Sequence, residues 1–286
     1  MSTDIEMLAA SINSLKNDSG IAKDILLPVL MSFISAFIGF FFARILFNQQ
    51  EKIKSEINKV NLINKYSIMV ADIRGSLLAI KYNYDSILDT HPINRALTMP
   101  NILNNNVAVT CNTYELSFIS EKSNGKQIAY YDTWMNVLRI SAMLNNYNQI
   151  IAILNQRNEI HIEIMTQIND YNKSSGIKVG SELGHDVINN MVGEVRIASL
   201  CALTERFISI VDDILMESSD FLINFPLEMD RLINQKVIKS QCTILKFKKE
   251  SIEITKTIEP DYKILASILC CSVEEAKAMC DNGYRR

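Results

Sequence analysis

The sequence has little glycine and little proline, nine and five residues respectively among 286. Folds made of many short strands need frequent tight turns, and glycine and proline supply much of the turn chemistry. Their scarcity argues strongly against a β-sandwich or barrel and predicts an all-α fold. Hydrophobic residues make up 48% of the chain, so a disordered protein is not expected either.

Neither sign of charge predominates, since 29 lysine and arginine residues face 32 acidic ones. A protein that coats nucleic acid would carry a basic face. The segment ILASILCCSVEEAKAM resembles half of a helix-turn-helix, with Ser272 and Glu275 forming the capping box of its second helix. Glu274 and Glu275 would then lie where such a motif approaches phosphates. We therefore expect no DNA partner.

The six cysteines form no C-x-x-C pair and no spacing typical of zinc or of a disulfide framework. We expect reduced thiols, with the adjacent Cys270 and Cys271 either packed or redox active.

Glu182 and His185 form one E-x-x-H, but a di-iron bundle requires two such motifs and further glutamates. The glycine cluster at 174–184 lacks the spacing of a phosphate-binding loop. The sequence thus predicts no metal and no cofactor.

Residues 25–47 are the longest apolar segment, and no charge occurs before Arg44. A bilayer core requires about 20 helical residues, so this segment predicts a transmembrane helix behind a short N-terminal tail, 1–24. A cleaved signal peptide is the alternative. The tail has no net positive charge and no A-x-A site follows, so we expect the segment to be retained.

Lysine and arginine residues near the two ends of this segment predict its orientation. Two precede it, whereas four follow it within about 20 residues; these are Lys16 and Lys23 before, and Arg44, Lys52, Lys54 and Lys59 after. The bias predicts an outside N-terminus and a cytoplasmic body, in agreement with unpaired cysteines.

Ser35, Gly39 and Ala43 recur every fourth residue within the apolar segment. Small residues at this interval allow two helices to approach closely in lipid. This face is a candidate for helix packing and homo-oligomerisation, although small residues are also common in any spanning helix.

The segment after the span, 48–90, has apolar residues in steps of three and four from Ile53 to Ile87. This period predicts one stalk helix continuous with the span and ending near Asp89. We expect its stripe to pair with a second copy as a coiled coil, and its last part to join a helical bundle.

Residues 91–258 are predicted to form that bundle, and 259–286 a C-terminal helix pair. We expect a loop at 91–106, a helix to about Ser120, and then helices at 127–171 and 187–219. A further helix is predicted to open at Pro226, and 242–258 is assigned weakly as helix rather than strand. A set of carboxylates on the helix from 187 is expected to be exposed: Glu205, Asp212, Asp213 and Glu217.

Arg157 and His161 are four residues apart, on one face of the helix predicted at 127–171. The segment RNEIH resembles the motif of HEPN ribonucleases, which are all-helical. The resemblance implies a cation and a general base that cleave a phosphodiester. That family usually places four to six residues between the two, and here there are three. The default interpretation is a solvent-exposed helix face.

The segments ADIRGSLLAIKYNYDSIL, NTYELSFIS and YDTWMNVLRISAMLNNYNQII follow the span and stalk. Together they resemble uncharacterised single-pass membrane proteins of bacterial mobile and defence islands. The resemblance implies a bacterial inner-membrane location and a role in phage defence. We predict a membrane-anchored interaction protein that is not an enzyme. The alternatives are a membrane-perturbing abortive-infection effector and a membrane-tethered HEPN-like ribonuclease.

Overall fold

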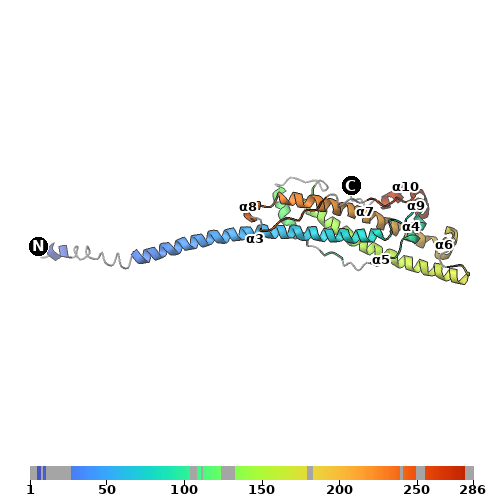
Figure 1. Cartoon of the computed structure of the whole chain (residues 1–286), viewed down its shortest axis with the longest axis horizontal. Helices are drawn as coiled ribbons and strands as arrows, with labels where there is room; N and C mark the ends of the chain where they lie inside the picture. Colours follow the sequence, from blue (N-terminus) through green and yellow to red (C-terminus); the bar gives the residue numbers. More distant parts are fainter. Residues whose placement is uncertain are drawn as a thin grey trace. The chain divides into compact units, whose positions relative to one another are not determined.

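The computed structural model describes residues 5–7, 9–10, 27–103, 108–110, 112–123, 133–178, 183–238, 241–248 and 255–280. Every regular element in these residues is a helix, as the composition predicts (Figure 1). The chain divides into two compact units. One contains 1–58 and 235–239, which includes the short helix α8 (Gln235–Ile238). The other contains 59–234 and 240–286 and is called the body below.

Helix α3 (Leu27–Tyr82) supplies residues to both units. Every residue from 28 to 50 is exposed, although the segment is apolar, and its mean hydropathy over 18 residues is 2.1. The helix is long and apolar enough to cross a membrane. The first two residues of the predicted span, and most of the tail before it, lie outside the described residues.

The second part of α3 belongs to the body and buries one stripe of side chains there. The stripe has the predicted spacing of three and four: Val60, Ile63, Tyr66, Val70, Ile73, Leu77 and Ile80. Since this chain covers the stripe, the expected coiled coil with a second copy is wrong for residues 60–80. The helix also ends at Tyr82 rather than near Asp89, in hydrogen-bonded turns that bury Tyr84.

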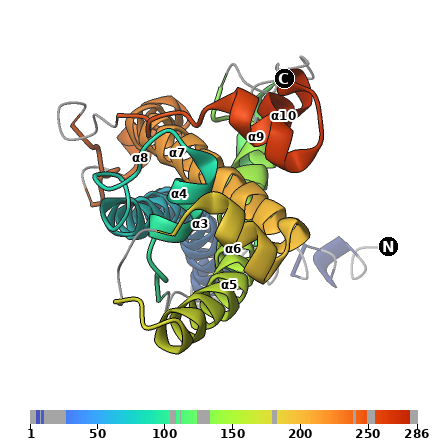
Figure 2. The same ribbon diagram turned by 90° about the vertical axis from the view of Figure 1, so that its right-hand side faces the viewer.

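Two long helices, α5 (Val137–Ser174) and α7 (Glu194–Asp230), pack along each other in the body (Figures 1 and 2). Helix α5 begins later than predicted, where the Asn136 side chain accepts a hydrogen bond from the Leu138 amide and caps the first turn. Residues 127–132 of the predicted helix lie outside the described part of the chain.

Two predictions about the next helices are wrong. Helix α6 (His185–Val192) is separate from α7, because Gly193 between them has a φ of 93°, which side-chain-bearing residues rarely adopt. Pro226 lies inside α7 instead of opening another helix. Its missing amide costs one hydrogen bond, but continuing the helix buries Phe225 and Met229 in the core.

The predicted loop at 91–106 contains a helix, α4 (Pro92–Thr98). Pro92 occupies the first turn, where its fixed φ suits a helix, and Ile93 and Ala96 are buried. The prediction of a loop rested on proline and is wrong here, because Pro92 starts a helix. After α4, the segment Thr113–Ser123 is a 3₁₀ helix, η2.

The C-terminal region contains the two predicted short helices, α9 (Tyr262–Leu269) and α10 (Val273–Cys280). The capping box is present: the Glu275 amide donates to Ser272 Oγ, and Glu275 Oε2 accepts from the Ser272 amide. Cys270 ends α9 in the left-handed conformation. The helix assigned weakly to 242–258 is absent from the described residues of that segment, 242–248 and 255–258.

A core cluster joins α4, α6, α9 and α10 to α5 and α7 (Figure 2). Its members include Ile93 of α4, Ile164 of α5, Ile188 of α6, Leu200 of α7 and Leu265 of α9. The short helices are therefore fixed by apolar contacts with the long pair rather than by their own length.

Candidate functional site

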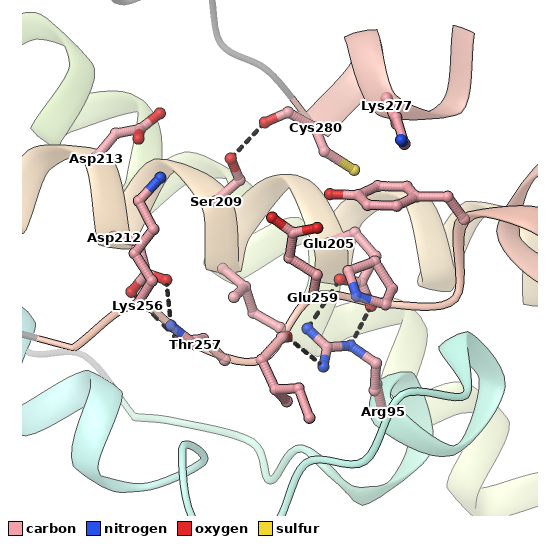
Figure 3. Close-up of a pocket in the computed structure, with 14 residues that line it drawn as sticks. Arg95, Glu205, Ser209, Asp212, Asp213, Lys256, Thr257, Glu259, Lys277 and Cys280 are labelled. Atoms are coloured by element: carbon pink, nitrogen blue, oxygen red, sulfur yellow. Dashed lines mark hydrogen bonds and ion pairs between the residues drawn. The ribbon is translucent and has the colours of Figure 1, made fainter. Parts of the chain in front are cut away.

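A pocket of about 350 Å³ lies in the body between α7, the segment 255–260 and the C-terminal helices (Figure 3). Its volume is at the lower end of the range for small-molecule sites. Arg95 of α4, Glu205 and Asp212 of α7, and Tyr262 and Cys280 of the C-terminal pair all line it. It thus gathers charged groups from elements far apart in the chain.

Arg95 and Glu205 form an ion pair at this pocket. Arg95 Nε donates to Glu205 Oε1 at 2.7 Å, and Nη2 donates to Oε2 at 3.0 Å. Arg95 Nη1 also donates to the main-chain oxygens of Asp89 and Ile258. Burial raises the pKa of Glu205, and the arginine opposes that shift. The pair therefore connects α4, α7 and the 255–260 segment.

Lys81 and Asp212 form a second buried pair. Lys81 Nζ lies 2.5 Å from Asp212 Oδ1 and donates to Thr257 Oγ1 and to the Thr255 carbonyl, both at 2.8 Å. The Thr257 amide donates to Asp212 Oδ2 at 2.7 Å. Both carboxylate oxygens are thus engaged, and the segment from 255 is held through its main chain.

These contacts correct the expected exposed row of carboxylates. Glu205 and Asp212 are only 3% and 6% exposed, and Glu217 is half-buried beside Arg139 at 3.2 Å. Asp213 is half-buried and lines the pocket. The sequence did carry a signal, because Glu205 and Asp212 are seven residues apart and so share the apolar face of their helix. It did not identify their partners.

The other side of the pocket contains proton donors. Burial raises the pKa of the Cys280 thiol to about 12, and burial together with the nearby thiol raises that of Tyr262 to about 12. Ser209 Oγ donates to the Cys280 carbonyl. The Lys277 ammonium lies 5.3 Å from the Tyr262 ring centroid. At neutral pH both raised groups stay protonated and can donate hydrogen bonds, but the thiol is not a nucleophile.

Arg157 and His161 lie on α5, but neither faces solvent; they are 0% and 6% exposed. Arg157 donates to the carbonyls of Ala96, Met99 and Pro100, where α4 ends. Burial lowers the pKa of Arg157 to about 10, so it remains charged at neutral pH. The default interpretation as an exposed helix face is therefore wrong.

His161 also contacts the main chain of α4. Its Nε2 lies 3.1 Å from the Leu97 carbonyl, so this nitrogen carries the proton, and Nδ1 is buried without a partner. Burial lowers the pKa of His161. The ring is neutral at pH 7 and sits against backbone, not beside a surface that a phosphodiester could reach.

The remaining candidates are spread over the chain. Glu182 lies outside the described residues, and His185 stacks on His91 with ring centroids 4.3 Å apart. Within the described residues no group of three histidine, cysteine or acidic side chains could hold a metal ion. Cys270 and Cys271 are free, and Cys270 is exposed.

The predicted packing face of the apolar segment is exposed on α3, at Ser35, Gly39 and Ala43. A Cβ atom built on Gly39 would meet nothing within 4 Å. The face is therefore open in the single chain.

Comparisons of the chain with protein-family models, curated proteins and solved structures find no match.

Proposed function

We propose that the protein is a single-pass membrane protein whose helical body binds partners. The observation that carries the proposal is the contrast along α3, where apolar side chains from 28 to 50 are all exposed and a buried stripe begins at Val60. Apolar side chains that no described residue covers are stable in lipid. The same helix also supplies a core element of the body.

The body is proposed to face the cytoplasm, because the basic excess follows the apolar segment. The resemblance to proteins of bacterial mobile and defence islands supports an inner-membrane location. It also supports a role as a sensor or effector of phage defence, in which the body recognises the trigger.

The pocket at Arg95 and Glu205 is the proposed recognition site of the body. Its buried pairs hold the walls in place, while Lys256 and Glu259 are exposed at its edge and offer charges of both signs. A preorganised polar pocket favours reversible binding of a small polar ligand or a partner's side chain.

Membrane attachment is tested by removing residues 25–47. The full chain should sediment with membranes and resist extraction at alkaline pH, whereas the shortened chain should be soluble. A control that removes residues 2–24 should stay in the membrane fraction. Recovery of the full chain as a soluble protein would overturn the proposal.

Orientation is tested with a reporter that is active only in the cytoplasm. Fused after Arg286 it should be active, and fused before Met1 it should be silent. The reverse pattern would contradict the orientation while leaving the anchor intact.

The exposed apolar segment also supports a second candidate, a membrane-perturbing effector. Its oligomerised spans would disturb the bilayer when the body senses a trigger. Overexpression should then cause dye leakage that requires residues 25–47, whereas a passive anchor of the same abundance should not.

A further inference from the structure

Two histidines connect α6 to the turn before α4. His91 precedes α4, and His185 is the first residue of α6. Their rings stack with centroids 4.3 Å apart and an interplanar angle of 24°. The pair lies outside the pocket described above and has no role in membrane attachment.

A chain of hydrogen bonds sets the proton positions of this pair. Asp89 accepts from the His91 amide at 2.8 Å and from Asn94 Nδ2 at 3.0 Å. Asn94 Oδ1 therefore faces His185 Nε2, 2.9 Å away, and this nitrogen of His185 carries a proton. His91 Nδ1 is buried without a hydrogen-bond partner. The His91 ring thus fits as a neutral imidazole with Nδ1 unprotonated.

An additional proton on His91 is poorly accommodated in this arrangement. Protonating His91 at Nδ1 would bury an N–H group without an acceptor. It would also place a charge against the stacked ring, and two imidazolium ions at this distance repel. Undocking of α6 removes both penalties, because each ring is then hydrated.

Apolar contacts with α5 and α7 also hold α6 to the body. Its buried residues are Ile188 and Val192, and Gly193 follows with its positive φ of 93°. A helix of eight residues has little stability of its own. The histidine stack and the His185–Asn94 hydrogen bond add an attachment to the start of α4, beside these apolar contacts.

We propose that the His91–His185 stack is a proton-operated latch, which holds α6 on α4 at neutral pH and releases it on mild acidification.

The charges around the pair determine how docking of α6 depends on pH. Burial and then the neighbouring His185 lower the pKa of His91, and Asp89 and Asp261 oppose that shift only in part. His91 therefore binds a proton more readily when α6 is undocked than when it is docked. Docking is strongest above pH 6.5 and weakens as the pH falls below that value toward the lowered pKa.

Other charged groups near α6 are either paired or exposed. Arg95 of α4 binds Glu205, and Arg196 at the start of α7 lies 3.8 Å from Glu163 of α5. Asp186 adjoins His185, and Glu194 begins α7; both are exposed. Exposed carboxylates are screened by solvent, so they moderate the lowering of the His91 pKa but do not reverse it.

Hydrogen exchange of the full chain in detergent micelles tests the latch. Between pH 8 and pH 5.5, after correction for intrinsic rates, protection of residues 185–192 should fall severalfold while that of α7 is kept. The variant His91→Phe keeps an aromatic stack but cannot be protonated, so its protection should not change with pH. His161→Gln is the control, in which the fall should persist. Equal loss in α6 and α7, or the same fall in His91→Phe, would overturn the proposal.

A second measurement covers the case in which His91→Phe does not fold. In the wild-type chain, nuclear magnetic resonance follows the ring signals of His91 and the methyl signals of Ile188. Both should change with the same midpoint, below pH 6.5. Methyl signals that stay constant while His91 titrates would overturn the latch.

Discussion

Arg95 and Glu205 are almost completely removed from water, with side chains 0% and 3% exposed. Removing a charge from water costs several kcal/mol, so such a pair contributes little net stability, yet leaving one partner alone is costly. The contacts of Arg95 with the main chain at Asp89 and Ile258 suggest that it fixes the pocket walls. We interpret the pair as a device for positioning rather than for stability.

The first prediction follows from that pair. Arg95→Met alone and Glu205→Leu alone should each lower the free energy of unfolding by about 3–5 kcal/mol, because a buried charge is left unpaired. The double variant should recover much of the loss. Denaturant unfolding measures this, with Arg196→Met and Glu163→Leu as a matched exposed pair that should change little. Additive losses in the double variant would contradict the interpretation.

Arg157 leads to a second prediction. Its guanidinium donates to three carbonyls around the end of α4, and a lysine cannot reproduce that fork. Arg157→Lys should lower the melting temperature of the body and reduce hydrogen-exchange protection of α4. Arg196→Lys, on an exposed arginine, is the control. If Arg157→Lys keeps full stability but loses a cellular activity, the ribonuclease hypothesis gains support instead.

The site was only partly predictable because a buried charge depends on its partner. The sequence places Glu205 and Asp212 on one helix face, but Arg95 is 110 residues from Glu205, and Lys81 is 131 residues from Asp212. An acidic residue without a known partner is more often exposed than buried. That general tendency led to the wrong prediction that Glu205 and Asp212 face solvent. The burial of Arg157 was missed for the same reason, since its acceptors are main-chain atoms of another helix.

Among the helices, α3 was the most predictable, because its spacing of three and four is uninterrupted from Val60 to Ile80. The wrong predictions of helix boundaries occurred at single proline and glycine residues, which can either end a helix or belong to one. Pro92 starts a helix where a loop was predicted, and Pro226 lies inside a helix that it was predicted to open. Nothing in the sequence around Gly193 marks a helix boundary, and only its φ of 93° shows that it separates two helices.

Gly193 gives the third prediction. A Cβ there would meet nothing within 4 Å, so any cost of Gly193→Ala comes from the backbone conformation and not from crowding. With a φ of 93° and a ψ of 135°, Gly193 lies in a region that is essentially confined to glycine. Holding another residue there costs about 1–3 kcal/mol, so α6 should lose protection from hydrogen exchange or join α7 in one helix. Gly184→Ala, at a glycine with a negative φ of −61° and equal space, is the control. Unchanged protection in Gly193→Ala would contradict this account.

The stripe of α3 gives the fourth prediction. Ile73 is 4% exposed, whereas Ile68 on the same helix is 49% exposed. Ile73→Asp would bury an unpaired carboxylate at a cost of several kcal/mol, so it should unfold the body rather than separate two copies. Ile68→Asp should retain the fold. Circular dichroism and the mass of the detergent complex distinguish unfolding from dissociation, and a folded monomer in Ile73→Asp would restore the coiled-coil hypothesis.

At the scale of the whole chain, one continuous helix, α3, carries two kinds of surface. Its residues to 50 expose apolar side chains all round, which in water would favour aggregation. From Val60 only one stripe is apolar and the remaining faces carry polar groups such as Lys65. The change from all-round to one-sided apolarity is what a helix leaving a bilayer for water requires. In the proposed membrane setting, the segment to 50 is therefore the part of the chain that is available for pairing.

The last prediction concerns that pairing. In lipid, helices associate through close packing and not through apolar transfer, so a bulky residue on a small-residue face separates them. Gly39→Ile should weaken a detergent-purified oligomer, seen as a shift toward the monomer in light scattering and in cross-linking of native membranes. Gly75→Ile is the matched control, because Gly75 lies on the same helix in the body and also has open space at its Cβ position. A wild-type chain that is monomeric in mild detergent and does not cross-link would refute pairing through Ser35, Gly39 and Ala43.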